Sequence, residues 1–136
     1  MRISNLIPAA ALLLLLSGCA TLSNPAETTY PGTPEGWVMS EDPGSGKPEV
    51  QWIRDGEKFA LVTWGSSTCP WTATEMKTDG DSQLTITLVE STKQQCTMDF
   101  APTTNVFSLP ADTTGRPVTV SVVMGEGGET SALTLD

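Results

Sequence analysis

The sequence predicts an all-β fold: a small antiparallel β-sandwich of seven or eight strands, immunoglobulin-like in architecture and carrying one disulfide. Three observations support this prediction. After Trp37, short runs of β-branched and aromatic residues alternate with turn residues. No stretch carries a sustained helical repeat, because proline or glycine interrupts almost every candidate window. Cys69 and Cys96 are available as one pair. A small β-barrel is the alternative architecture.

The chain begins with a segment typical of a secretory signal peptide. Arg2 precedes an apolar run from Leu6 to Leu16. A helix of about eleven residues rises about 16 Å, well short of the ~30 Å hydrocarbon core of a bilayer, so a membrane-spanning helix is not expected. A positive start, a short apolar centre and small residues at its end are the features of a signal peptide.

The apolar run ends in Leu16-Ser17-Gly18-Cys19. These four residues resemble the lipobox of bacterial lipoproteins. The resemblance implies that the Cys19 thiol receives a diacylglyceryl group and that cleavage removes residues 1–18. Acyl chains on Cys19 would then hold the protein at the cell membrane, on its extracytoplasmic face. Each buried CH₂ contributes about 0.8 kcal/mol, so two or more chains give stable anchoring. The alternative is an ordinary secreted protein with a chance cysteine near its cleavage site.

Residues 19–36 are predicted to be a flexible lipidated tether, and residues 37–136 a single β-sandwich domain. Pro25, Pro31 and Pro34 disfavour helix and sheet, and the rest of the segment is mostly small or polar. The 118 residues that follow residue 18 are sufficient for one modest domain.

The strands of the domain are predicted from alternation and turn signals. Residues 50–54 and 58–64 are runs of β-formers on either side of Asp55-Gly56, which is a strong hairpin signal. Residues 84–88 alternate between aliphatic residues and threonine, the pattern of a half-buried strand. The same alternation predicts further strands at 96–100, 106–109, 118–122 and 133–135, with turns at 79–80, 111–115 and 125–128.

Acidic residues dominate the charge: 16 Asp and Glu stand against 7 Lys and Arg, for a net charge of −9. Nucleic acid is not an expected partner, because binding it depends on neutralising phosphates with cationic side chains. Adsorption to anionic lipid is disfavoured for the same reason. The simplest role of this acidity is solubility outside the cell.

In an exported chain, the two cysteines left after lipidation, Cys69 and Cys96, are predicted to form a structural disulfide. Their spacing is unlike Cys-x-x-Cys, so neither a redox centre nor a zinc site is expected. Closing this loop should stabilise the fold by roughly 3–4 kcal/mol on the chain-entropy model.

Histidine is absent from the sequence, which removes Ser-His-Asp and Cys-His activation and the commonest zinc and copper ligand. Carboxylate pairs are the remaining catalytic option, and four carboxylates lie close in sequence: Glu75, Asp79, Asp81 and Glu90. The alternative function is therefore a carboxylate-based hydrolase acting on envelope polysaccharide. Asp79 and Asp81 are also a candidate calcium site, although the ordered acidic loop of such sites is missing. No other metal and no cofactor is expected.

The candidate ligand-binding residues flank and form one loop: Trp71, Trp64, Ser66 and Ser67. Bridging Cys69 would hold this loop rigid, and tryptophan on a rigid loop presents a large contact area at low entropic cost. Trp71, close behind the bridged cysteine, is the expected anchor. Trp64 ends an alternating strand and is expected in the core. The alternative is that both indoles pack in the core against the bridge.

Three features of the mature half occur together: the Gly-Ser-Ser-x-Cys-Pro loop at 65–70, the later Cys96, and a Pro-Thr-Thr to Leu-Pro segment at 102–110. They resemble small secreted lipoproteins of unknown function from actinobacterial-type Gram-positive bacteria, a resemblance that implies no activity. The predicted function is a binding or structural role at the cell envelope, with an envelope protein or glycan as partner.

Overall fold

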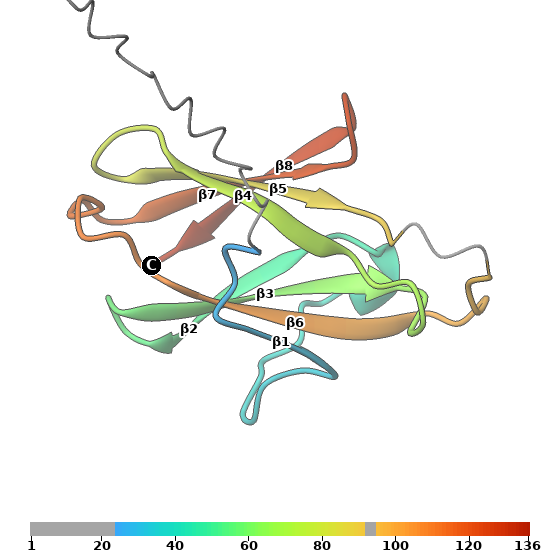
Figure 1. Cartoon of the computed structure of the whole chain (residues 1–136). Helices are drawn as coiled ribbons and strands as arrows, with labels where there is room; N and C mark the ends of the chain where they lie inside the picture. The colour runs from blue at the N-terminus through green and yellow to red at the C-terminus, as the bar shows by residue number, and fades with distance from the viewer. Residues whose placement is uncertain (1–23, 92–94) are drawn as a thin grey trace, which may run out of the picture.

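The computed structural model describes residues 24–91 and 95–136, which form two four-stranded sheets packed face to face (Figure 1). The predicted all-β sandwich is confirmed. The first sheet has the strand order β1-β6-β3-β2 and the second β4-β5-β7-β8. The elements are β1 (Thr28–Pro31), a 3₁₀ turn η1 (Pro43–Ser45), β2 (Glu49–Arg54), β3 (Lys58–Gly65), β4 (Thr72–Thr78), β5 (Gln83–Val89), β6 (Ala101–Ser108), β7 (Val118–Met124) and β8 (Glu129–Leu135).

No helix in these two ranges is both long and apolar enough to cross a membrane. The predicted signal peptide and Cys19, the predicted site of lipidation, lie outside the described residues.

The core lies between the two sheets. Phe59 of β3 and Phe107 of β6 are fully buried and stack with their ring centroids 5.4 Å apart. The alternating aliphatic side chains of the second sheet complete the core: Leu84, Ile86 and Leu88 of β5, and Val118, Val120 and Val122 of β7. Because successive side chains of a strand point to opposite faces, the period-2 pattern in the sequence placed these side chains on one face correctly.

One strand pair runs parallel. β5 pairs with β7 in parallel, whereas the other hydrogen-bonded pairs of both sheets are antiparallel. The chain leaves β5, forms β6 in the first sheet and only then returns as β7. This crossover lets β7 run in the same direction as β5, so the second sheet is mixed.

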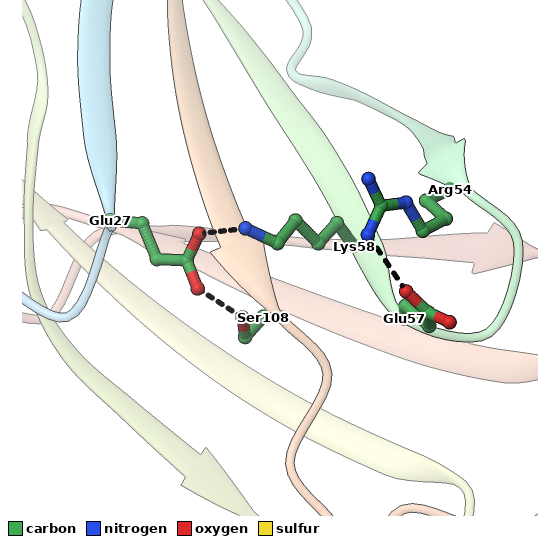
Figure 2. A network of polar contacts seen from close by, with 5 residues as sticks. All are labelled: Glu27, Arg54, Glu57, Lys58 and Ser108. Carbon is green, nitrogen blue, oxygen red and sulfur yellow. Dashed lines mark hydrogen bonds and ion pairs between the residues drawn. The ribbon is translucent and has the colours of Figure 1, made fainter.

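The hairpin predicted at Asp55-Gly56 is confirmed. The Glu57 N–H donates to the carbonyl of Arg54 at 2.9 Å, and the two side chains of this pair form an ion pair at 3.1 Å (Figure 2). Gly56 adopts a φ of +70°, in the left-handed region that glycine enters without steric cost. The Asp-Gly signal was reliable here because it reports a local backbone requirement.

Both faces of the first sheet are covered. Ala60, Val62 and Thr104 are fully buried, although strand alternation places them on the face opposite to Phe59. The segment 32–48, between β1 and β2, passes on this outer side (Figure 1). The Thr104 hydroxyl donates to the carbonyl of Gly32 at 2.6 Å, which ties the segment to the sheet.

The predicted tether 19–36 contains β1, so the prediction of a flexible segment was wrong for residues 28–31. Within this stretch the four residues of β1 pair with β6. Just before β1, Glu27 accepts hydrogen bonds from Lys58 of β3, at 2.6 Å, and from Ser108 of β6 (Figure 2). Proline is tolerated in an edge strand, which is why the proline-rich composition did not prevent pairing. Residues 19–23 of the predicted tether lie outside the described residues.

Two further stretches differ from the predicted strands. Residues 95–100 form no strand, and their apolar side chains are exposed, Met98 completely and Phe100 by 53%. The alternation of apolar residues in this segment was misleading, because no neighbouring strand pairs with it. The Cys96 bridge and side-chain hydrogen bonds hold the segment instead. β4 forms although its sequence is largely polar, because an edge strand needs little burial: Ala73 is its only fully buried residue.

We expect acid to release β1 before it unfolds the sandwich. The hydrogen bond from Lys58 and then that from Ser108 lower the pKa of Glu27 below its ordinary value of 4.5. A lowered folded-state pKa contributes stability that is complete above the unfolded pKa and is lost as the pH falls through the folded pKa. Hydrogen exchange at 27–31, corrected for its intrinsic pH dependence, should therefore accelerate on going from about pH 6 to about pH 3.

Glu27→Gln is the matched control, since it keeps the side-chain shape and removes the titration. Protection of 27–31 in this variant should be lower and independent of pH over the same range. Identical pH dependence in the variant and the wild type would contradict the assignment to Glu27.

Candidate binding groove

A groove runs along one open side of the sandwich, between β2 of the first sheet and β8 of the second. Its central hollow has a volume of about 460 Å³. Its apolar surface is formed by four residues: Val38, Pro48, Val50 and Leu133. These residues are separated by up to about a hundred positions in the chain and meet only because the two edge strands lie beside each other.

The groove continues toward Trp71. A second hollow, of about 430 Å³, shares Lys47 and Pro48 with the first and is bounded by Trp71 and Met124. Trp71 is partly buried and packs against the edge of the core. Its indole also lies against Gly65, where a Cβ would stand 3.7 Å from Nε1. Trp71 is therefore both a core contact and the end wall of the groove.

At the opposite end, a hydrogen bond joins the two sheets. The Trp52 indole donates to the carbonyl of Asp136 at 2.8 Å. The guanidinium of Arg116 lies over the Trp52 ring, with Cζ 4.6 Å from the ring centroid, and pairs with Asp55 at 2.9 Å. A third hollow, of about 360 Å³, lies beside the contact between Trp52 and Asp136. These interactions hold β2 and β8 together at this end.

One wall of the groove comes from the segment before β2. The Gln51 amide donates to the carbonyl of Val38 at 2.5 Å, and the Val38 N–H donates to Oε1 of Gln51 at 3.3 Å. The Ser40 hydroxyl donates to Glu49 at 2.7 Å. These bonds fix the wall on β2 and leave the Val38 side chain 72% exposed at the groove.

Negative charge predominates around the groove. Asp42, Glu49 and Glu129 contribute carboxylates to its walls, against the single amine of Lys47. Within the described ranges, none of these carboxylates takes part in an ion pair. The groove therefore favours a ligand that carries both apolar surface and positive charge.

The predicted disulfide is confirmed: Cys69 and Cys96 are joined, with their Cα atoms 5.4 Å apart. Trp64 is near Cys69 in the sequence. The prediction that Trp64 lies in the core was wrong. Strand alternation places it on the outer face of the first sheet, where it stacks on Phe100 with ring centroids 5.5 Å apart. A Cβ on Gly46 would contact the same Phe100 ring at 3.5 Å.

Ser66 and Ser67 bond to a neighbouring loop and do not line the groove. Their hydroxyls lie 3.0 and 3.3 Å from that of Thr97, and the Ser67 N–H donates to Asp99 at 3.0 Å. Hydrogen bonds from the Ser67 side chain, the Thr97 hydroxyl and the Ser67 backbone lower the pKa of Asp99 to about 2. These groups satisfy one another, so the structure brings only Trp71 of the four predicted ligand-binding residues to the groove.

The carboxylates of the alternative hydrolase hypothesis also lie outside the groove: Glu75, Asp79, Asp81 and Glu90. The Asp79 carboxylate accepts a hydrogen bond from Thr85. No group of three or more His, Cys, Asp or Glu side chains in the described part of the chain could hold a metal ion. Among the residues that the structure describes, no third acidic side chain joins Asp79 and Asp81 in such a group.

Comparison with protein-family models, with curated proteins and with solved structures finds no match to this chain. The candidate site consequently rests on its geometry. The sequence pointed to Trp71 because it follows Cys69-Pro70, where a disulfide would hold the loop rigid. It gave no signal for Lys47, Pro48 or Leu133, which gain their place in the groove only through the packing of β2 beside β8.

Proposed function

We propose that this protein is a lipid-anchored, extracytoplasmic domain that binds an envelope protein or glycan in the groove between β2 and β8. The groove carries the binding part of this proposal, because its two hollows share lining residues and together present apolar walls, carboxylates without an ion-pair partner in the described ranges, and a partly exposed tryptophan. The lipobox Leu16–Cys19 supports the anchoring part. A membrane-tethered domain with such a groove would concentrate its partner at the membrane surface.

Photo-crosslinking in intact cells tests the binding role. A photoreactive amino acid replaces Ser45, which is exposed and lines the groove, and in a separate variant replaces Asp81, which is exposed outside it. Irradiation should yield a discrete product from position 45 and none from position 81. Equal products from both positions, or none from position 45, would contradict a binding role for the groove.

Trp71→Ala should weaken binding of the cross-linked partner by about ten-fold or more, because a desolvated aromatic anchor carries a large share of the affinity of a specific interface. Asp79→Asn and Asp81→Asn should change the affinity little, because both carboxylates lie outside the groove and attraction between exposed charges is screened over about 8 Å at physiological salt. The measurement is a titration of the partner at low and at moderate salt.

Because Trp71 also contacts the core, the experiment must check that the Trp71→Ala variant is folded. Trp71→Phe keeps an aromatic ring against the core and removes part of the contact area, so it should retain the melting temperature better than alanine and bind with intermediate affinity. Unchanged affinity in a folded Trp71→Ala variant would place the binding surface elsewhere.

A further inference from the structure

The two sheets have four edge strands, and three of them carry features that obstruct the pairing of a further strand. β1 has only four residues and ends in Pro31. β2 and β4 each contain an irregularity in their register, at 52–54 and 73–75. β4 also presents an exposed ion pair between Glu75 and Lys77 at 3.3 Å. Short length, proline, bulges and charged side chains are the usual protections of an edge.

The fourth edge strand, β8, lacks these protections. It pairs with β7 in unbroken register over seven residue pairs and contains no proline. Its sequence, ETSALTL, has one charged residue, Glu129, at its first position. In the described part of the chain no strand pairs with its other edge. Half of its backbone N–H and C=O groups therefore point away from β7, where a strand could bind them.

We infer that β8 accepts an extended, cationic segment of another protein as an added strand. This inference rests on the proposed binding role and specifies the partner as a polypeptide. Main-chain hydrogen bonds to β8 would supply affinity, and alternate side chains of the added strand would supply specificity. The groove lies directly beside this edge, since Ser131, Leu133 and Thr134 of β8 line it.

The groove determines which side chains suit the added strand. Leu133 pairs with Val120, whose side chain is in the core, so Leu133 and the groove lie on the inner side of the sheet. Side chains of the added strand on that side would enter between Leu133 and Val50 and meet apolar surface. Basic side chains could pair with Glu129 and Glu49, whose carboxylates have no ion-pair partner within the described ranges.

Charge argues against a second copy of this chain as the occupant. Antiparallel pairing of β8 with β8 about Ala132 would bring Glu129 of one copy next to Leu135 and the adjacent, exposed Asp136 of the other. Such a dimer would place like charges together at both ends of the joined edge, in a protein with a net charge of −9. A cationic segment would instead be attracted to the same two carboxylates.

The test uses the full chain in detergent and a capped, fluorescently labelled seven-residue peptide, Lys-Thr-Val-Thr-Val-Thr-Lys. Its odd-numbered side chains share one face, so in either strand direction a lysine can face Glu129 while the valines face the apolar surface beside Leu133. Binding is measured by fluorescence anisotropy, and its position by hydrogen–deuterium exchange. Exchange should slow at 129–135 and not at β4 (72–78), the corresponding edge on the other side of the same sheet. Protection on another edge, or no binding of the probe, would overturn the inference.

Two kinds of control peptide separate strand addition from charge attraction. The first carries N-methyl groups on every second amide and is prepared in both registers, so that one register blocks the hydrogen bonds to β8. That register should bind about ten-fold more weakly or worse, because several backbone bonds are lost while charge and composition are kept. The second replaces lysine by glutamate and should also bind more weakly. Equal binding of both N-methylated registers and the parent would overturn the inference.

Glu129→Gln provides the matched protein variant, since Glu129 is exposed at the start of β8 and contributes no core packing. It should weaken binding of the lysine peptide and leave the melting temperature unchanged. Protection of 129–135 that rises with protein concentration in the absence of peptide would show a second copy and overturn the inference. The two proposals can fail separately. If position 45 cross-links to a partner in cells but the peptide does not protect β8, the proposed binding function stands and strand addition is overturned.

Discussion

Opening the Cys69–Cys96 bridge is expected to lower the free energy of unfolding by about 3–4 kcal/mol. The two residues are 27 positions apart, so the bridge closes a loop that contains β4 and β5 and restricts the unfolded chain. In the folded protein it also ties the loop after β3 to residues 95–100, which have no strand pairing of their own. For a domain of this size, the loss corresponds to a fall in melting temperature of roughly 10–20 °C.

Thermal unfolding with and without reductant measures this effect. The single variants Cys69→Ala and Cys96→Ala and the double variant should all show a loss of similar size, because either change removes the same bridge. Met98→Ala, in the segment that the bridge holds, is the control and should be neutral, since the Met98 side chain is fully exposed. An unchanged melting temperature on reduction would contradict a stabilising role for the bridge.

Cys19→Ala is expected to release the protein from the membrane fraction and to abolish the diacylglycerol mass on its N-terminal peptide. The expectation follows from the lipobox Leu16–Cys19. Each acyl CH₂ buried in the bilayer contributes about 0.8 kcal/mol, so losing two chains removes far more binding energy than the rest of an acidic domain could replace. Detergent partitioning and mass spectrometry of the mature protein measure both changes.

Cys96→Ala is the matched control for this experiment: it removes a cysteine and the disulfide but keeps Cys19. It should remain in the membrane fraction, even though its fold is less stable. A wild-type protein that is unmodified, freely soluble and begins at a residue other than Cys19 would contradict the lipidation hypothesis.

Local patterns in the sequence were sufficient for most of the sandwich. The hairpin of β2 and β3 follows from Asp55-Gly56, because the turn needs a residue that tolerates positive φ. β5 and β7 follow from strict alternation, because one face of each is fully buried. The Cys69–Cys96 bridge follows from counting, since one cysteine of three is assigned to the lipobox.

The alternation of apolar residues did not predict the polar strands, for a physical reason. β6 was predicted only from residue 106, although Thr103, Thr104 and Asn105 are buried in it. The Thr29 hydroxyl of β1 donates to Oδ1 of Asn105 at 3.0 Å, so a neighbouring strand compensates the burial of this oxygen. Such compensation depends on a residue 76 positions away and leaves no periodic signal in the chain.

The sequence by itself determined the fold class, the disulfide pair and the strongest turn, and it predicted Trp71 as a candidate contact. It also carries the lipobox-like residues Leu16–Cys19, and lipidation at Cys19 stays a prediction. Only the tertiary structure decided that Trp71 ends a groove, that Trp64 stacks on Phe100 outside the core, and that β8 is an unprotected edge. Alternation and turns depend on neighbours within a few residues, whereas a groove and a free edge depend on which distant strands lie side by side. That choice is made by packing two sheets around one core.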